Sequence, residues 1–464
     1  MADQPTTRLA ASGHRFLMRR MEHALVRRNI AMHDDPLRAQ SLSLVAGCVL
    51  GVIAVAACAI LAFVRPQGSL GSAPIVMARD SGALYVRLDD VLHPVPNLAS
   101  ARMIAGSAAN PVVVAEATIA SARRGPSMGI PGAPAAIGAP LAAPSWMVCD
   151  TDRTVVIVGA ETSATDRLDD ARSVLVAPRG EGPATTYLLY DGRRAEVDLR
   201  NPAVVRALRL EGVAPVLVSR ALLDTLPEVP AIAAPVVDGA GAAGPRSLEG
   251  VPVGAVVRVV RADATDYYAV LRDGVQRIGE VAADLIRFTY RGLDGVPVVA
   301  PSAIARTSAV DGLAVGHLPQ RAREPVGADG SAAVCVLWHA DQVDDRSRSV
   351  VLVGNPSIAA GTTSLAQADG DGPNVDAVAL PAGRVVDARA AAIIGDDGSS
   401  GPRYLVSDMG VVYGIHDDDV ASHLGLAGPP APAPWPILAA LPRGPELSVE
   451  AASVVRDGLA AAPP

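Results

Sequence analysis

A stretch without a charged side chain, residues 39–64, constrains the fold more than any other part of this chain. Arg38 and Arg65 bound it, and Leu, Val, Ile and Phe recur through its length. At a helical rise of about 1.5 Å per residue, it is long enough to cross a hydrocarbon core of about 30 Å. The apolar region of a secretory signal peptide is shorter, about 7 to 15 residues, and no charge interrupts the run as would be usual in a buried core helix. We therefore expect an uncleaved transmembrane helix over residues 41–64.

The charge balance on the two sides of this segment predicts its orientation. Residues 1–40 contain seven Arg against four acidic residues, whereas residues 66–464 contain 32 Arg against 44 acidic residues. Because positive residues stay on the cytoplasmic side, we expect a single-pass protein of the inner (cell) membrane with a cytoplasmic N-terminus and an extracytoplasmic C-terminal region. An acidic exterior also argues against nucleic-acid binding.

The cytoplasmic segment, residues 1–40, has a helical period between residues 8 and 28. Its apolar positions are Leu9, Phe16, Leu17, Met21 and Leu25. Its basic positions are Arg15, Arg19, Arg20, Arg27 and Arg28. A basic amphipathic helix of this kind is expected either to lie on the anionic inner leaflet or to bind a partner protein.

Small residues recur every four positions within the span, at Ser43, Gly47 and Gly51. They form one small face along which a second helix could pack closely, although small residues are common in membrane helices in general. We expect Cys48 and Cys58, which also lie in the span, to be ordinary small apolar residues.

Two further cysteines, Cys149 and Cys335, fall in the exterior region, each in a short apolar run beside an aromatic residue. An even number of cysteines in an oxidising compartment makes one disulfide between them the expected pairing.

A pattern of strand, tight turn, strand and short helix recurs four times in the exterior region. Asp-Gly turns at residues 191–192 and 273–274, and Asn201 followed by Pro202, are typical of a hairpin and of a helix start. We expect an α+β fold in which the transmembrane helix is followed by an elongated region of four small strand-strand-helix repeats around a central β-rich domain. The expected repeats are residues 65–122, 186–226, 247–295 and 401–428. Chance similarity of hairpin-plus-helix stretches remains an alternative, above all for the first.

The segments between the repeats have two different compositions. Val-rich stretches within residues 146–185 and 296–400 are expected to build the two parts of the central domain. Residues 123–145 and 227–246, rich in Gly, Pro and Ala, are expected as linkers or wrapping arms, and residues 429–464 as a Pro/Ala-rich tail.

The sequence contains few candidates for catalysis. All 40 basic residues are Arg, so a Schiff-base lysine and a phosphate-loop lysine are excluded. The stretch at residues 239–244 matches G-x-G-x-x-G, but Pro235 and Pro245 flank it, and Ser127 of a G-x-S-x-G match lies in a Pro-rich segment. His416, followed by three Asp, is expected in a solvated turn. We predict no catalytic, cofactor-binding or metal site.

Several segments resemble one known family. The segment SGHRFLMRRMEHALVRR (residues 12–28), followed by a single span, resembles the N-terminus of the EccB family, a membrane component of actinobacterial type VII (ESX) secretion systems. The resemblance continues through LDDVLHPV (88–95), NLASAR (97–102), and residues 223–241 and 435–448. It implies an inner-membrane anchor, an elongated region of four repeats around a disulfide-stabilised central domain, and assembly with EccC-, EccD- and EccE-type components. We also expect the exterior repeats to pair with copies of themselves.

We therefore expect a structural core subunit of a secretion complex, building its extracytoplasmic part. Some members of the family are described as ATPases, so an ATP-hydrolysing subunit without a Walker motif is an alternative, with ATP a possible ligand by family analogy only. A cell-envelope-binding module is a second alternative, disfavoured because aromatic residues that could stack on sugars make up only 3% of the chain.

Overall fold

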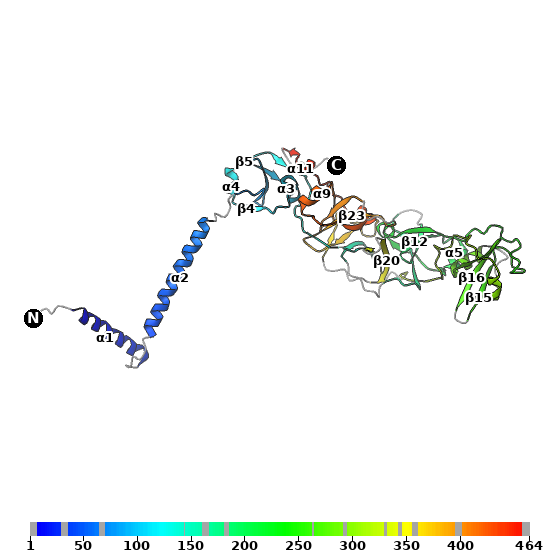
Figure 1. Ribbon diagram of the computed structural model, residues 1–464, viewed down its shortest axis with the longest axis horizontal. Coiled ribbons are helices and arrows are strands. Elements are labelled where there is room, and N and C mark those ends of the chain that lie inside the picture. The colour runs from blue at the N-terminus through cyan, green and yellow to red at the C-terminus, as the bar shows by residue number, and fades with distance from the viewer. Residues whose placement is uncertain are drawn as a thin grey trace, which may run out of the picture. The chain divides into compact units, whose positions relative to one another are not determined.

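The computed structural model forms two compact units, Met1–Gly71 and Ser72–Pro464 (Figure 1). It describes residues 7–28, 36–64, 70–142, 144–159, 167–180, 185–261, 264–290, 295–328, 332–341, 346–354, 361–394 and 401–456. Parts of the expected cytoplasmic segment (1–6 and 29–35) and of the expected tail (457–464) lie outside the described residues.

The described residues of the first unit form two helices. Helix α1 (Arg8–Arg27) begins at Thr7, whose hydroxyl accepts a hydrogen bond from the Ala10 backbone N–H, and ends where Arg28 adopts a left-handed conformation. Helix α2 (Pro36–Val64) is 29 residues long. Its segment Ser41–Ile60 is long and apolar enough to cross a membrane, and the side chains of this segment are exposed. An apolar helix that buries none of this surface against its own chain is typical of a membrane span.

Among the described residues of the second unit, four β-hairpins are each followed directly by a helix. The hairpins and helices are β2 (Leu84–Leu88), β3 (Val91–Val95) and α3 (Leu98–Ala105); β11 (Thr186–Tyr190), β12 (Arg193–Val197) and α5 (Pro202–Ala207); β16 (Thr265–Leu271), β17 (Gly274–Ile278) and α7 (Glu280–Thr289); β24 (Arg403–Val406), β25 (Val412–Ile415) and α9 (Asp418–Leu424). Local chemistry explains these elements. Asp191 and Gly192 have φ values of 48° and 68°, as a tight hairpin turn requires, and the Asn201 side chain caps α5.

Each hairpin belongs to a larger sheet. An antiparallel strand precedes each one: β1 (Ile75–Ala78), β10 (Arg172–Pro178), β15 (Val256–Val260) and β23 (Arg384–Ala391). After each helix, the chain returns and pairs in parallel with the strand that precedes the hairpin. Three returning segments are strands: β4 (Val112–Val114), β13 (Val216–Val218) and β26 (Ala431–Pro434). In the third case the pairing is the single bridge of Val298 to Arg258. A short helix follows: α4 (Glu116–Ser121), α6 (Arg220–Asp224), α8 (Pro301–Ala305) or α10 (Trp435–Ala440).

In each sheet, a later segment of the chain then pairs in parallel with the second strand of the hairpin. The closing segments are β5 (Arg123–Arg124), β14 (Glu228–Ile232), the bridge of Ala309 to Val275, and the bridges of Arg443 to Val412 and Leu447 to Ile415. We name residues 75–124, 172–232, 256–309 and 384–447 the first to fourth hairpin units. The second, third and fourth units are longer than the expected repeats, whereas the first is shorter. Strands β10 and β23 belong to the second and fourth units although they were expected in the central domain.

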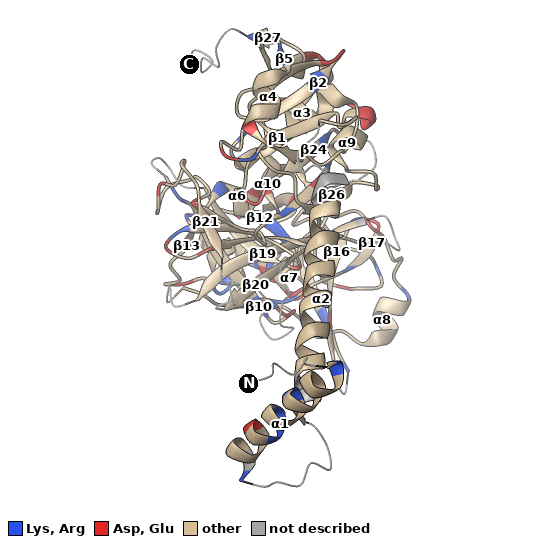
Figure 2. Cartoon of the chain, turned by 90° about the vertical axis from the view of Figure 1, so that its left-hand side faces the viewer, with Lys and Arg blue, Asp and Glu red and all other residues tan. Residues whose placement is uncertain are grey.

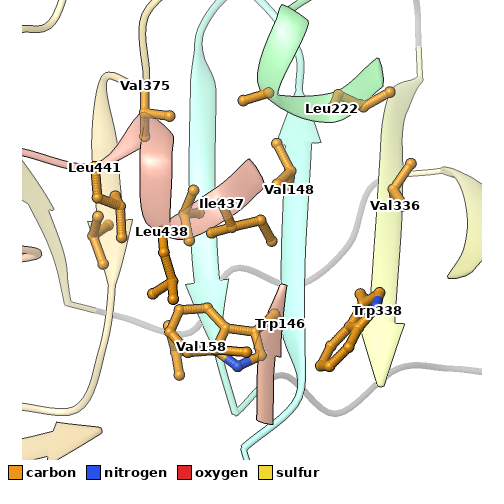
Figure 3. Close-up of a cluster of buried hydrophobic side chains, with 14 of the residues drawn as sticks. Trp146, Val148, Val158, Leu222, Val336, Trp338, Val375, Ile437, Leu438 and Leu441 are labelled. Atoms are coloured by element: carbon orange, nitrogen blue, oxygen red, sulfur yellow. The ribbon is translucent and has the colours of Figure 1, made fainter. Parts of the chain in front are cut away.

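A six-stranded sheet lies between these units in the chain. Its order is β20 (Arg346–Gly354), β19 (Ala333–Asp341), β8 (Trp146–Asp150), β9 (Thr154–Val158), β22 (Ala377–Ala379) and β21 (Thr362–Ser364). Trp146 and Trp338 face each other across β8 and β19 and are fully buried (Figure 3). Their cluster also contains Leu222 of the second hairpin unit and Leu438 of the fourth, so these sheets share one core. Small sheets cannot bury enough surface alone, which makes this sharing necessary.

The segments expected as linkers and tail are packed parts of this unit. Residues 123–145 contribute β5, β6 (Ser127–Met128) and β7 (Ala139–Pro140), and residues 227–246 contain β14. The expected tail supplies β26, α10, α11 (Val449–Ala452) and β27 (Val455–Arg456). The small residues permit close backbone contact instead of disorder. A Cβ atom on Gly138, for example, would lie 2.0 Å from the carbonyl oxygen of Gly383.

Candidate assembly interfaces and structural centres

Helix α1 presents its basic side chains to solvent. Arg15, Arg19 and Arg20 are exposed along the helix, and Arg28 is exposed just after it. Figure 2 shows blue basic positions spread along the ribbon of α1. The side chain of Arg27 lies outside the described residues. Because residues four apart lie on one helix face, Arg15 and Arg19 are neighbours, one turn apart. This arrangement offers a positive surface.

The small face of α2 is open. Ser43, Gly47 and Gly51 are exposed, and a Cβ atom built on either glycine would meet no heavy atom within 4 Å. A second helix could therefore approach the backbone closely here. Cys48 and Cys58 are exposed on the same helix and are not bonded to each other.

Cys149 and Cys335 are joined by a disulfide. They face each other across β8 and β19, three residues from the tryptophan pair along the same register, and both are buried. The bond closes a sequence separation of 186 residues, which holds the two parts of the six-stranded sheet together.

A buried polar cluster connects this sheet to the second hairpin unit. The Asp150 carboxylate accepts hydrogen bonds from the Ser219 backbone N–H at 2.5 Å and from the Thr154 hydroxyl at 2.8 Å. Arg179 donates to the Thr154 hydroxyl at 3.2 Å and to the Thr151 carbonyl at 2.6 Å. Burial raises the pKa of Asp150 above its ordinary value, although the hydrogen bonds and Arg179 favour the charged form.

The direction of this pKa shift predicts how the stability of the protein changes with pH. A carboxyl whose pKa is raised by folding binds more protons in the folded state, so its contribution to stability falls as pH rises above 3.8 and levels off above the raised pKa. Asp150→Asn should remove that dependence. We expect the wild type to gain stability relative to the variant as pH falls from 7 to 4, measured by denaturant unfolding of both proteins. A difference that stays constant, or that grows with pH, would contradict this assignment.

The fourth hairpin unit is organised around Arg403. Its guanidinium donates to both carboxylate oxygens of Asp387, at 2.8 and 2.6 Å, and both side chains are buried. It also donates to Asp418 at 2.7 Å and to the Leu426 carbonyl at 2.9 Å, just beyond the end of α9. One side chain therefore holds β23, β24 and the end of α9 together.

A second buried arginine joins the first and fourth hairpin units. Arg102 on α3 donates to the carbonyl of Leu424, the last residue of α9, at 2.9 Å, and to Asn110 at 3.0 Å. Burial lowers the pKa of Arg102. Helix α3 also packs against α9 and α11, so segments that are more than 300 residues apart form one body.

The glycine-rich and serine motifs do not have the strand-turn-helix setting that the nucleotide-binding and nucleophile motifs require. Residues 239–244 lie in turns, no helix begins there, and a Cβ on Gly244 would lie 2.2 Å from the Val251 carbonyl. Ser127 lies on β6, paired with Arg456, and not at a strand-to-helix turn. His416 lies 3.1 Å from Glu446, and Asp417 caps α9. Among the described residues, no three His, Cys, Asp or Glu side chains are placed to hold a metal ion.

The returning strands carry exposed aliphatic side chains that the expectations above did not include. At matching places in the first three hairpin units, Val113, Leu217 and Val298 are 41%, 58% and 59% exposed. The corresponding position on β26 is Pro432. Proline protects a sheet edge from pairing, whereas an edge without proline or charge is open to pairing with another chain. The recurring Pro-Val dipeptides at residues 111–112, 215–216 and 297–298 are the sequence signal that could have identified these edges.

Comparison with known proteins places the chain in one family. A sequence model described as "Type VII secretion system ESX-1, transport TM domain B" matches residues 3–461. The ESX-3 secretion system ATPase EccB3 of Mycolicibacterium smegmatis is 36% identical over 98% of this chain and 92% of its own length. The ESX-2 secretion system ATPase EccB2 of Mycobacterium tuberculosis is 36% identical over 96% of this chain and 94% of its own length.

Solved structures agree with this placement. A chain of an intact ESX-5 inner membrane complex is similar with a TM-score of 0.74 and 31% identity, covering 100% of this chain and 98% of that chain. The EccB3 dimer from the ESX-3 core complex is similar with a TM-score of 0.72 and 36% identity, covering 82% of this chain and 100% of that chain. From the match along almost its whole length, the chain belongs to the EccB family of type VII secretion system membrane proteins.

Proposed function

We propose that this chain is a structural, membrane-anchored core subunit of a type VII secretion complex and builds the extracytoplasmic part of that complex. The observation that carries the proposal is the similarity of the whole chain to a subunit of an intact ESX-5 inner membrane complex. The described residues support a role through contacts, because they hold a disulfide, a buried ion pair and exposed helix and strand surfaces.

In this proposal α2 spans the inner membrane with α1 in the cytoplasm and the second unit outside. The excess of Arg before the span and of acidic residues after it supports that orientation. The buried disulfide also fits an oxidising exterior.

In this role, the four hairpin units are repeats of one fold around the six-stranded sheet. Their common order of antiparallel and parallel pairings supports this relationship. Copies of the chain pair through the second unit, and EccC-, EccD- and EccE-type components complete the complex. A solved EccB3 dimer supports pairing between copies, and the exposed aliphatic positions Val113, Leu217 and Val298 are the surfaces we assign to such contacts.

Extraction in a mild detergent with an affinity tag on the chain tests complex membership. We expect mass spectrometry of the eluate to find EccC-, EccD- and EccE-type proteins together with an untagged second copy of this chain. Recovery of the tagged chain alone, as a monomer, would refute the proposal.

The small face of α2 is proposed to contact another helix of the complex. Replacing both Gly47 and Gly51 with Leu should fill that face and reduce recovery of the complex at least ten-fold, because close backbone approach is lost. Val45→Leu and Val49→Leu add bulk at other positions of the same helix and serve as the matched control. Unchanged recovery of the complex with the double glycine variant would show that the small face of α2 contacts lipid instead of another helix.

ATP hydrolysis is the second candidate function, favoured by the word ATPase in the names of the relatives. Full-length protein purified in detergent would be assayed for phosphate release. Turnover that a single substitution abolishes, without loss of folding, would establish an enzyme. Turnover that disappears on further purification would leave the structural role.

A further inference from the structure

Helix α1 has two unlike faces, and nothing in the described part of the chain covers the apolar one. Leu17, Met21 and Leu25 follow each other at intervals of four residues and are 55%, 55% and 81% exposed. Met18 lies beside them. Side chains spaced by four residues lie on one face of a helix, so these residues form a continuous apolar stripe.

The side of the helix away from this stripe carries Arg side chains together with the exposed Leu9, Phe16 and Val26. Arg8, Arg15 and Arg19 are spaced by seven and four residues and lie roughly 120° to 160° around the helix from Met21 at the centre of the stripe, at about 100° per residue. The whole helix contains five Arg against one Glu. A strongly amphipathic helix with Arg on its polar face typically lies in the plane of an anionic membrane surface.

The chain also keeps α1 close to such a surface. Helix α1 is capped at Arg28, and α2 begins at Pro36. The intervening residues 29–35 can extend over at most about 28 Å, at roughly 3.5 Å per residue. If α2 is anchored as proposed above, α1 therefore stays within that reach of the end of the span and of the lipid headgroups around it.

We infer that α1 is a lipid-binding element that lies flat on an anionic phospholipid surface. The stripe of Leu17, Met21 and Leu25 enters the boundary between headgroups and acyl chains, and Arg8, Arg15 and Arg19 face the phosphates. Charge complementarity selects lipid as the occupant, since cationic side chains near an anionic leaflet gain electrostatic attraction in addition to apolar burial.

Hydrogen exchange of the full chain in nanodiscs tests this inference. We expect amides of residues 10–27 to exchange at least ten-fold more slowly in discs containing 30% phosphatidylglycerol than in discs of phosphatidylcholine alone. Raising the salt to 0.5 M should remove most of the difference, because screening weakens charge attraction. Adding inorganic phosphate to phosphatidylcholine discs should not reproduce it.

Variants of α1 separate the contribution of the Arg charges from that of the apolar stripe. The triple variant R8Q/R15Q/R19Q should exchange equally fast in both discs, whereas R8K/R15K/R19K should behave as the wild type because charge is retained. L17Q/M21Q/L25Q should lose protection in both. Equal exchange of the wild type in the two discs would overturn the inference, and so would protection that arises only with other secretion components present. Failure of the chain to enter nanodiscs would instead contradict the proposed anchoring.

Discussion

Removing the disulfide with the double substitution Cys149→Ala and Cys335→Ala is expected to cause the largest single loss of stability in this protein. The bond closes a separation of 186 residues, and in the chain-entropy account such a loop contributes about 5 kcal/mol. Alanine keeps the buried positions apolar, so most of the loss comes from the freed unfolded chain. Trp146 and Trp338 lie three residues from the substituted positions on the same two strands and are fully buried, so their fluorescence reports unfolding in denaturant.

The two cysteines of the span provide the control. Cys48→Ala and Cys58→Ala change exposed residues of α2 and should leave the unfolding midpoint of the second unit unchanged. Two free thiols at Cys149 and Cys335 in the native protein, found by non-reducing mass spectrometry, would contradict the account. A loss of stability below about 1 kcal/mol would contradict it as well.

Breaking the Arg403–Asp387 pair is expected to have the second largest effect. Arg403→Met leaves the buried carboxylate of Asp387 without its partner, and removal of one member of a buried pair costs about 3 to 5 kcal/mol. The same change frees the Leu426 carbonyl. The rate of amide hydrogen exchange in this variant should therefore increase most in β23, β24 and the segment after α9, and less in the six-stranded sheet.

A double variant distinguishes lost pairing from lost packing. Arg403→Met combined with Asp387→Leu removes both charges, and such apolar replacements are often close to neutral, so we expect it to recover at least half of the loss. Arg200→Met is the matched control, because Arg200 and Asp198 pair on the surface and exposed pairs contribute about 0 to 1 kcal/mol. A double variant less stable than Arg403→Met would disprove the importance of the pair.

Local signals in the sequence predicted the hairpins well. Asp191-Gly192 and Asn201-Pro202 act through their own backbone preferences, which do not depend on the rest of the fold. The strands that close each sheet were missed for the opposite reason. The pairings of Arg443 with Val412 and of Ala309 with Val275 are single parallel bridges between distant residues, and no local pattern specifies them.

Composition alone was misleading for the glycine- and proline-rich segments. Such segments usually fail to order themselves, but here Gly138 and Gly244 allow backbone contacts that any Cβ would prevent, and their neighbours become part of the packed unit. The basic and apolar positions of α1 could be predicted because helical period is a local property. The Arg403 and Asp150 centres could not, since each depends on which distant carboxylate or backbone group the fold brings beside it.

The central claim is that this chain builds a secretion complex by anchoring and contact. Its most direct test is a deletion strain in which membrane complexes are sized by native electrophoresis and secreted proteins are measured. We predict that the complex and secretion are both lost, that the full chain restores both, and that residues 72–464 exported without the span restore neither. A complex of normal size with undiminished secretion in the deletion strain would contradict the claim.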